Sequence, residues 1–220
     1  MGVRELAFKV AVLALAAACG CALTDATIDP PWLRDVGTRA QRGQGRELVV
    51  VTPFADSRPD RERCGMKKNS YNSDLAKVLC TRPPRYFLSD LLETDLKASG
   101  FRIARRPAPG VAVVHGDLSQ FFLEPKLGFL STTIEADIEL LLVVETPDGF
   151  VARRHFYVKG EQGTVFVSQA DQQAAANRAI RLLLLDTVGA IANLLDHHPA
   201  PLASATTPVN RGAPAPGGDE

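Results

Sequence analysis

The chain has 220 residues and a balanced charge, with 25 Lys and Arg side chains against 25 Asp and Glu side chains. This balance argues against a nucleic-acid-binding surface and against a polybasic membrane patch. Aromatic residues make up only 6% of the chain, which argues against a surface that stacks sugars or bases. Without a leader and polar ends, roughly 150 residues remain, which is enough for one domain.

The first residues predict a secretory signal. Residues 10–21 read VAVLALAAACGC and follow the basic residues Arg4 and Lys9, which is the order of n-region, apolar h-region and small-residue cleavage zone. The apolar run is too short for a membrane span of about 20 residues. Because three alanines precede Cys19, the segment resembles a bacterial lipoprotein signal, in which the cysteine is acylated and becomes the N-terminus. Cys19 is the predicted lipidation site and Cys21 the alternative. An ordinary cleaved signal stays open.

Four segments follow from this interpretation. We predict a signal peptide at residues 1–18, a flexible tether at 19–45, a single periplasmic domain at 46–198, and a disordered Pro-, Ala- and Gly-rich tail at 199–220. The residue after Cys19 is glycine and not aspartate. By resemblance to enteric lipoproteins, this favours the outer membrane, with the domain facing the periplasm.

A long polar segment follows the first predicted strand. Residues 46–54 (RELVVVTPF) are a short β-branched run ended by a proline, as in a buried strand. Residues 55–84 contain charges, Gly, Asn and Pro, and they are predicted to form an unusually long loop, which is either functional or disordered. This loop offers the candidate binding residues Asp56, Arg58, Lys67, Lys68, Asn69 and Tyr71. The alternative is that Asp56 and Arg58 pair with each other locally and that the lysines are only solvated.

The remaining cysteines, Cys64 and Cys80, predict a disulfide. An oxidising compartment favours this pairing, and the bond would contribute about 3 kcal/mol by constraining the unfolded chain. A reactive thiol is the weaker alternative, because no C-x-x-C motif is present. The four histidines and the cysteines show no zinc-ligand spacing, so we predict no metal and no cofactor.

The second half of the chain predicts helices and antiparallel strands. Residues 85–99 have leucines at helical spacing, and strands are expected at 101–104 and 111–123. Residues 134–144 alternate strictly, and after a Thr-Pro-Asp-Gly turn residues 150–161 return as their partner, with acidic side chains opposite basic ones. A capping box at Ser168 begins a helix that runs to about Asp196, where His197 and His198 favour its negative end. The predicted fold is α+β: a two-layer sandwich with a mostly antiparallel sheet of about four or five strands and two helices on one face.

Several motifs resemble the YajG-type bacterial lipoprotein family. They are VVTPFADSRPDR at residues 50–61, the stretch Gly65 to Tyr71, the helix end KASGF, and the later strand from Ser131 to Val144. The resemblance covers roughly residues 46–195 and departs from the family in the segment around Cys64 and Cys80 and in the tail. It implies an Asp-x-Arg element at Asp56 and Arg58 and a long C-terminal helix. Because the family has no firmly assigned chemistry, the resemblance implies location and fold more than mechanism.

These features predict a non-catalytic binding or scaffolding module in the cell envelope. It would be held on the membrane by its N-terminal lipid and would bind another envelope component, not nucleic acid. The alternative is an auxiliary lipoprotein of an envelope ABC-type or lipid-transport system, which an apolar cleft between sheet and long helix would favour. An enzyme is not expected, because the sequence contains no Gly-x-Ser-x-Gly, His-Glu-x-x-His or phosphate-binding glycine loop.

Overall fold

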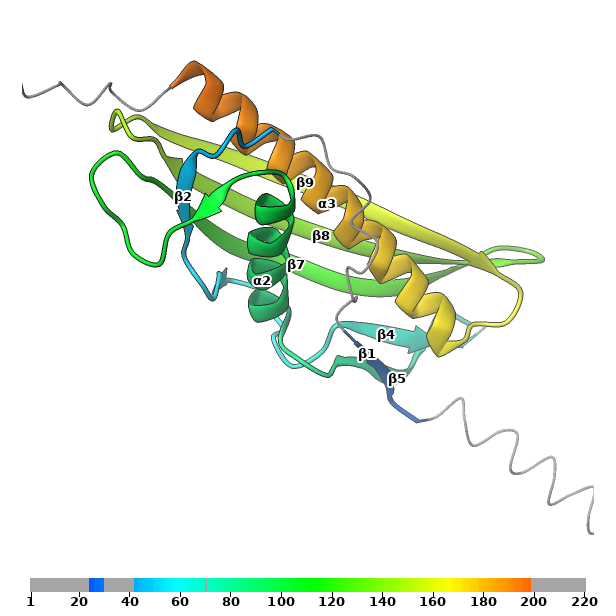
Figure 1. The fold of residues 1–220 in the computed structure, drawn as a ribbon. Coiled ribbons are helices and arrows are strands. Elements are labelled where there is room, and N and C mark those ends of the chain that lie inside the picture. Colours follow the sequence, from blue (N-terminus) through cyan, green and yellow to red (C-terminus); the bar gives the residue numbers. More distant parts are fainter. Residues whose placement is uncertain (1–23, 30–41, 70, 199–220) are drawn as a thin grey trace, which may run out of the picture.

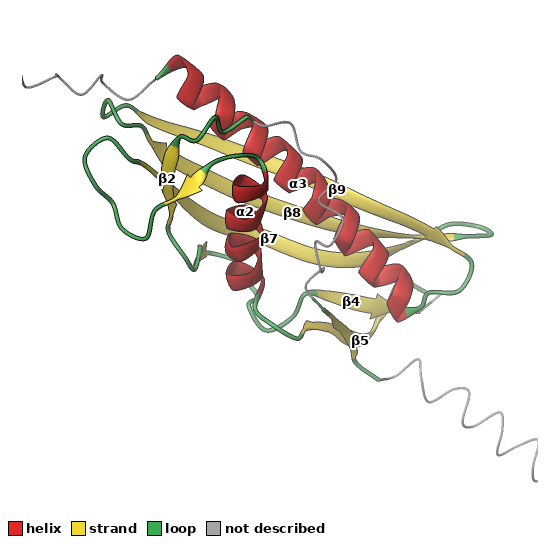
Figure 2. Ribbon diagram, viewed as in Figure 1, coloured by secondary structure: helices red, strands yellow, loops and turns green. Residues whose placement is uncertain are grey.

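The computed structural model describes residues 24–29, 42–69 and 71–198. The predicted signal, both lipidation candidates Cys19 and Cys21, and the predicted tail lie outside these residues. The described chain forms two helices and a mixed, open sheet of nine strands (Figures 1 and 2). The α+β class is confirmed. The expectation of four or five mostly antiparallel strands is wrong, because short parallel strands extend the sheet.

The long strand β7 (Ala112–Leu127) is the centre of the sheet. Along one edge it pairs antiparallel with β8 (Thr132–Glu145), with one register shift between Leu118 and Gln120. Along its other edge three short strands pair with it in parallel, one after another. They are β2 (Glu47–Val50), β3 (Ala55–Asp56) and β4 (Gly65–Lys68). A single strand therefore holds together the start of the domain and its C-terminal half.

Four further strands complete the sheet. Next to β8 runs β9 (Val151–Thr164), which is antiparallel to it, and β2 pairs in parallel with β6 (Arg102–Ile103). The strand β5 (Asp74–Cys80) forms an antiparallel hairpin with β4, and β1 (Ala26–Ile28) adds to β5 in parallel.

The predicted pairing of β8 with β9 is confirmed, with acidic side chains of β8 opposite basic side chains of β9. The Nζ atom of Lys159 lies 2.7 Å from a carboxylate oxygen of Glu135, and Nε2 of His155 lies 3.0 Å from Glu139. Between them, the Tyr157 hydroxyl donates to Asp137 at 2.7 Å. This charged face of the hairpin is open to solvent, while Ile138, Leu140, Phe156 and Val158 on the other face are buried.

Both helices lie on the same face of the sheet, as predicted (Figure 1). The helix α2 (Pro84–Ala98) buries Leu88, Leu92 and Leu96, and the ring of Phe87 meets the ring of Phe121 on β7 edge-on at 5.7 Å. The helix α3 (Gln169–His197) begins with the predicted capping box, in which Ser168 and Asp171 satisfy each other's backbone N–H groups. It then runs diagonally across β8 and β9 (Figure 2).

The predicted loop at residues 55–84 is wrong over most of its length, because it contains β3, β4 and β5. These strands bury few side chains of their own. They form because β3 and β4 pair with β7, while β5 pairs with β4 and β1. Residues 26–28, which the sequence placed in the tether, form β1. The side chain of Gln173 on α3 fixes the end of β1 by accepting from the N–H of Asp29 at 2.9 Å and donating to its carbonyl at 2.8 Å.

Within the described parts of the chain, neither helix combines the length and the apolar character that a membrane span requires.

Candidate functional site

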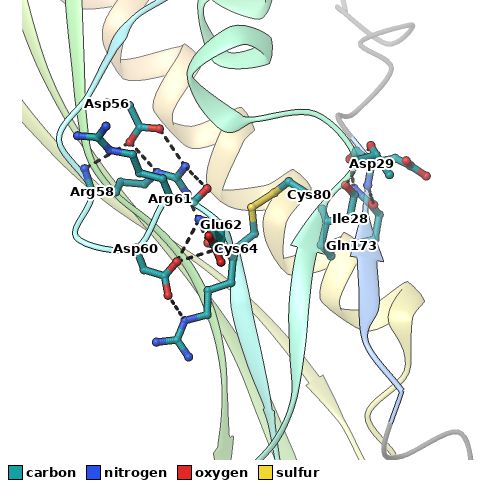
Figure 3. The surroundings of a disulfide bond; sticks show 12 residues. Ile28, Asp29, Asp56, Arg58, Asp60, Arg61, Glu62, Cys64, Cys80 and Gln173 are labelled. Carbon is teal, nitrogen blue, oxygen red and sulfur yellow. Dashed lines mark hydrogen bonds and ion pairs between the residues drawn. A yellow bond between two sulfur atoms is a disulfide. The ribbon is translucent and has the colours of Figure 1, made fainter.

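Asp56 and Arg58, the first predicted binding residues, form a buried ion pair. The guanidinium of Arg58 donates to both carboxylate oxygens of Asp56, at 2.9 and 3.0 Å, and the two side chains are only 2% and 4% exposed (Figure 3). Arg58 also donates to the carbonyl of Arg61 at 3.3 Å, so it holds the turn after β3 in shape. The structure therefore agrees with the alternative that Asp56 and Arg58 pair with each other locally. Neither charge is available to a partner on the surface.

Burial by itself raises the pKa of Asp56. The hydrogen bonds and the positive charge of Arg58 outweigh this effect and hold the pKa below the ordinary value of 3.8. The carboxylate of Asp56 is therefore ionised at neutral pH, and the pair acts as a structural unit of the domain.

The other four predicted residues lie on the β4–β5 hairpin. Lys67 donates to the carbonyl of Thr24 at 2.8 Å, and Lys68 is paired with Glu124 of β7. The side chain of Asn69 accepts from the N–H groups of Tyr71 and Ser73 and so closes the hairpin turn. Tyr71, at 87% exposed, projects from the tip. The six residues therefore do not converge on one site.

The predicted Cys64–Cys80 disulfide is present (Figure 3). It joins the two strands at the end of the hairpin opposite the turn. The Cα atoms are 5.8 Å apart, and the cysteines have a sequence separation of 16. Cys80 is also the register partner of Ile28 on β1. The bond therefore stabilises the edge of the sheet, by about 3 kcal/mol for a closed chain segment of this size.

An apolar groove lies between the C-terminal part of α3 and the strands β8 and β9. We call it the α3 groove, and its volume is about 570 Å³. Its floor and walls are formed by Leu142, Val144, Ala152, Phe156, Ile191 and Leu194. A concave site of this size with mostly apolar walls is typical of a site for a small molecule or an acyl chain.

The rim of the α3 groove is basic. Arg154 reaches it from β9, where it pairs with Leu142, and His197 and His198 reach it from the end of α3. The guanidinium of Arg154 lies over the ring of Phe156, 5.6 Å from its centre. Since the walls are apolar and the rim carries the permanent positive charge of Arg154, the groove suits a ligand with an apolar body and an anionic end.

His198 closes one end of the α3 groove. Its ring stacks on the half-exposed ring of Phe150 with 4.3 Å between the ring centres, and its Nδ1 lies 3.0 Å from a carboxylate oxygen of Asp148. A hydrogen bond from the Thr146 hydroxyl, together with those from His198 and the N–H of Phe150, lowers the pKa of Asp148 to about 2. The β8–β9 turn is thereby fixed to the end of the helix.

The α3 groove opens because α3 approaches β9 closely only where small residues face each other. A methyl group on Gly160 would lie 2.2 Å from the carbonyl oxygen of Ala175 and 2.4 Å from the backbone nitrogen of Ala179. Farther along α3, the residues that face the sheet are larger, including Leu183, Leu184 and Ile191. Larger side chains hold a helix farther from its neighbour. The groove lies at this wider end.

Among the described residues, no group of three or more His, Cys, Asp or Glu side chains could hold a metal ion.

The family model of the bacterial proteins described as "Uncharacterized lipoprotein" matches residues 38–189, which is more than half of the chain. The chain belongs to this lipoprotein family. The resemblance to YajG-type lipoproteins is confirmed by this match. Membership also supports a place in the cell envelope and a lipid anchor. None of the curated proteins compared with the lipoprotein matches it.

Comparison with solved structures supports the fold. A Xanthomonas campestris protein of the DUF330 family superposes with a TM-score of 0.54 at 17% identity, covering 78% of this lipoprotein and 98% of that chain. A minor lipoprotein from Acinetobacter baumannii matches with a TM-score of 0.37 at 14% identity, covering 68% of this lipoprotein and 94% of that chain. At these identities, the first likeness shows the fold alone.

Sequence reasoning missed the α3 groove. Leu142, Val144 and Leu194 have the spacing of ordinary core residues, and only the packing of α3 on β9 leaves space beside them. One signal was available, since Arg154 alternates with Ala152 and Phe156 on the strand face that turns toward α3. The histidines were correctly placed at the end of α3, but their position on the rim of a groove depends on the tertiary structure.

Proposed function

We propose that the lipoprotein is a non-catalytic binding module, anchored by lipid in the outer membrane and facing the periplasm. Family membership and the alanine-flanked cysteines near the N-terminus support this anchoring. The observation that carries the binding role is the α3 groove, which combines apolar walls with the guanidinium of Arg154 at its rim. Its ligand class is an amphiphile with an acyl or similarly apolar body and an anionic end.

The α3 groove also favours a second function, that of an auxiliary lipoprotein in an envelope ABC-type or lipid-transport system. Such a role needs a place for an acyl chain between the sheet and the long helix, and the groove occupies that place. The two functions differ in whether the protein transfers lipid between membranes. An auxiliary transport protein would accelerate the passage of a fluorescent phospholipid from donor to acceptor vesicles, whereas a scaffolding module would bind the lipid without this effect.

The lipid anchor is tested by intact mass spectrometry of the protein extracted from membranes. We expect the mass of a chain that begins at Cys19, or at Cys21, with three acyl chains added and two hydrogens lost to the Cys64–Cys80 disulfide. Replacing both Cys19 and Cys21 by serine should remove the acyl mass and leave the disulfide. A wild-type chain without acyl groups would contradict the proposed anchoring.

The binding role is tested by filling the α3 groove. We expect Ala152→Trp to lower the affinity for the fluorescent acyl probe cis-parinaric acid at least about tenfold, because the indole occupies the space between β9 and Leu194. The matched control is Val151→Trp on the next residue of the same strand. Val151 is 44% exposed and does not line the groove, so affinity should be unchanged.

Charge at the rim gives a second comparison in the same assay. Arg154→Gln should weaken the binding of cis-parinaric acid more than the binding of the uncharged probe N-phenyl-1-naphthylamine. Only cis-parinaric acid has a carboxylate that can pair with the guanidinium. Equal binding of both probes by wild type, Ala152→Trp and Val151→Trp would show that the groove is not the binding site.

A further inference from the structure

One end of the molecule exposes large apolar side chains. The turn between β7 and β8 presents Phe129 at 98% exposed and Leu130 at 81%, and the segment between β9 and α3 presents Val165 at 67% and Phe166 at 85%. Together with Tyr71 on the β4–β5 turn, we call this set the apolar tip. Turn residues are ordinarily polar, and contiguous exposed apolar groups of this size usually mark a contact surface.

The strand register brings these segments to the same end of the sheet (Figure 1). Thr132, which follows the Phe129 turn, pairs with both Leu127 and Thr164, and Thr164 directly precedes the segment with Phe166. The strand β4 runs parallel to β7, with Gly65 opposite Leu123, so its turn points the same way. The ion pair between Lys68 and Glu124 fixes that turn beside the end of β7.

The N-terminal part of the chain leaves the domain from this end. The strand β1 is parallel to β5, which starts at the hairpin turn, so the first residue described, Thr24, lies on the side of the apolar tip. Lys67 of β4 holds the carbonyl of Thr24 at 2.8 Å. Cys19 is five positions before Thr24 in the sequence and Cys21 is three. Even fully extended, five residues reach only about 17 Å.

We infer that the apolar tip is a membrane-docking face, which inserts into the surface of the bilayer that holds the lipid anchor. This inference rests on the proposed anchoring at Cys19 or Cys21. A tether this short keeps the tip within reach of the bilayer, and the exposed tyrosine and phenylalanines are suited to the interface between headgroups and acyl chains. The membrane therefore covers the side chains that would otherwise be exposed to water.

This docking gives the α3 groove a defined position. Val144 in the groove is 12 positions along β8 from Thr132 at the apolar tip, which corresponds to roughly 40 Å of strand. The domain then stands upright on the membrane, and the groove opens at the far end, away from the bilayer. Its occupant would come from the aqueous space or from another envelope component and not directly from the anchoring leaflet.

The inference is tested by tryptophan fluorescence in vesicles that contain phosphatidylethanolamine, phosphatidylglycerol and brominated phosphatidylcholine. The full chain is used as extracted from membranes, with its single native tryptophan removed by Trp32→Phe. Single variants Phe129→Trp and Phe166→Trp report on the apolar tip, and Val151→Trp reports on the opposite end. We expect bromine to quench most of the emission of both tip variants and to leave the Val151→Trp variant unquenched.

Other results would overturn the inference. Unquenched tip variants with emission shifted to shorter wavelength would mean that a second copy or a protein partner covers the apolar tip. Quenching of all three variants alike would mean that the domain has no fixed orientation. Intact mass spectrometry of the same samples reports the acyl chains separately. If these are absent, the unacylated chain is mixed with the vesicles, and quenching confined to the tip variants still supports docking, while its absence overturns it.

Discussion

Substitution of Gly160 by alanine is expected to lower the free energy of unfolding by about 3 kcal/mol and the melting temperature by about 10 °C. The added methyl group would meet backbone atoms of α3, at 2.2 Å from the Ala175 carbonyl oxygen and 2.4 Å from the Ala179 nitrogen. Backbone atoms within a helix cannot rotate away as a flexible side chain can. Helix α3 must therefore shift as a body, which disturbs its packing over β8 and β9. Thermal unfolding followed by circular dichroism measures the effect.

The matched control for this prediction is Gly163→Ala, three residues along the same strand. Gly163 is exposed, and a methyl group there would meet no atom within 4 Å. Its substitution should change stability by no more than about 0.5 kcal/mol, because alanine also restricts the unfolded chain. Equal losses for the two variants would contradict the close contact of α3 with β9. A shifted α3 should also change the affinity of the α3 groove for cis-parinaric acid, since the helix forms one wall of the groove.

Breaking the Asp56–Arg58 pair is the second change with a large expected effect. Arg58→Met should destabilise the protein by about 3–5 kcal/mol, because it leaves the carboxylate of Asp56 buried without its partner. The double variant Asp56→Asn, Arg58→Met removes both charges. Its loss in free energy of unfolding should be smaller than the sum of the losses of Asp56→Asn and Arg58→Met measured singly. Chemical denaturation of the four proteins gives this coupling energy.

The control for the buried pair is Lys97→Met, which breaks the ion pair with Glu93 on α2. There the two side chains are 56% and 30% exposed, so the loss should stay within about 0.5 kcal/mol. If Arg58→Met were equally mild, the Asp56–Arg58 pair would not be the structural unit that its burial indicates.

The Asp56–Arg58 pair also predicts how stability depends on pH. Because the folded state lowers the pKa of Asp56 below 3.8, its contribution is complete above that value and is lost as the pH falls through the lower pKa of the folded state. Wild-type stability should therefore decline more steeply below pH 4 than that of Asp56→Asn, which has no carboxylate to protonate. Urea unfolding at a series of acidic pH values makes this comparison.

The apolar tip and the α3 groove suggest how the molecule is organised. The two features lie at opposite ends of the same long strands, and the disulfide-linked hairpin secures the sheet edge near the tip. If the tip docks on the membrane as we infer, the rigid sheet acts as a spacer that presents the groove at a fixed distance from the bilayer. The buried Asp56–Arg58 pair then serves this spacer, since it fixes the turn that leads from β3 into the hairpin.

The sequence by itself determined the long elements of this protein. Strict alternation defined β8, the turn and the opposite charges defined its pairing with β9, and the leucine spacing and capping box defined both helices. These signals are local, since each element carries its own periodicity or its own cap. The two cysteines of the hairpin, together with the oxidising compartment that the sequence predicted for them, were likewise sufficient to pair Cys64 with Cys80. Family membership agreed with motifs that could be recognised in the chain.

Only the tertiary structure decided the short strands, the groove and the tip. Strands β1, β3 and β4 have two to four residues and too few apolar side chains to show a period, and their backbone groups are satisfied by β5 and β7. Asp56 and Arg58 look like surface charges in the sequence, because burial comes from segments distant in the chain. The groove arises from the unequal spacing between α3 and the sheet, and the apolar tip from turns that the register brings together. All of these depend on contacts between segments far apart in sequence, which local patterns do not encode.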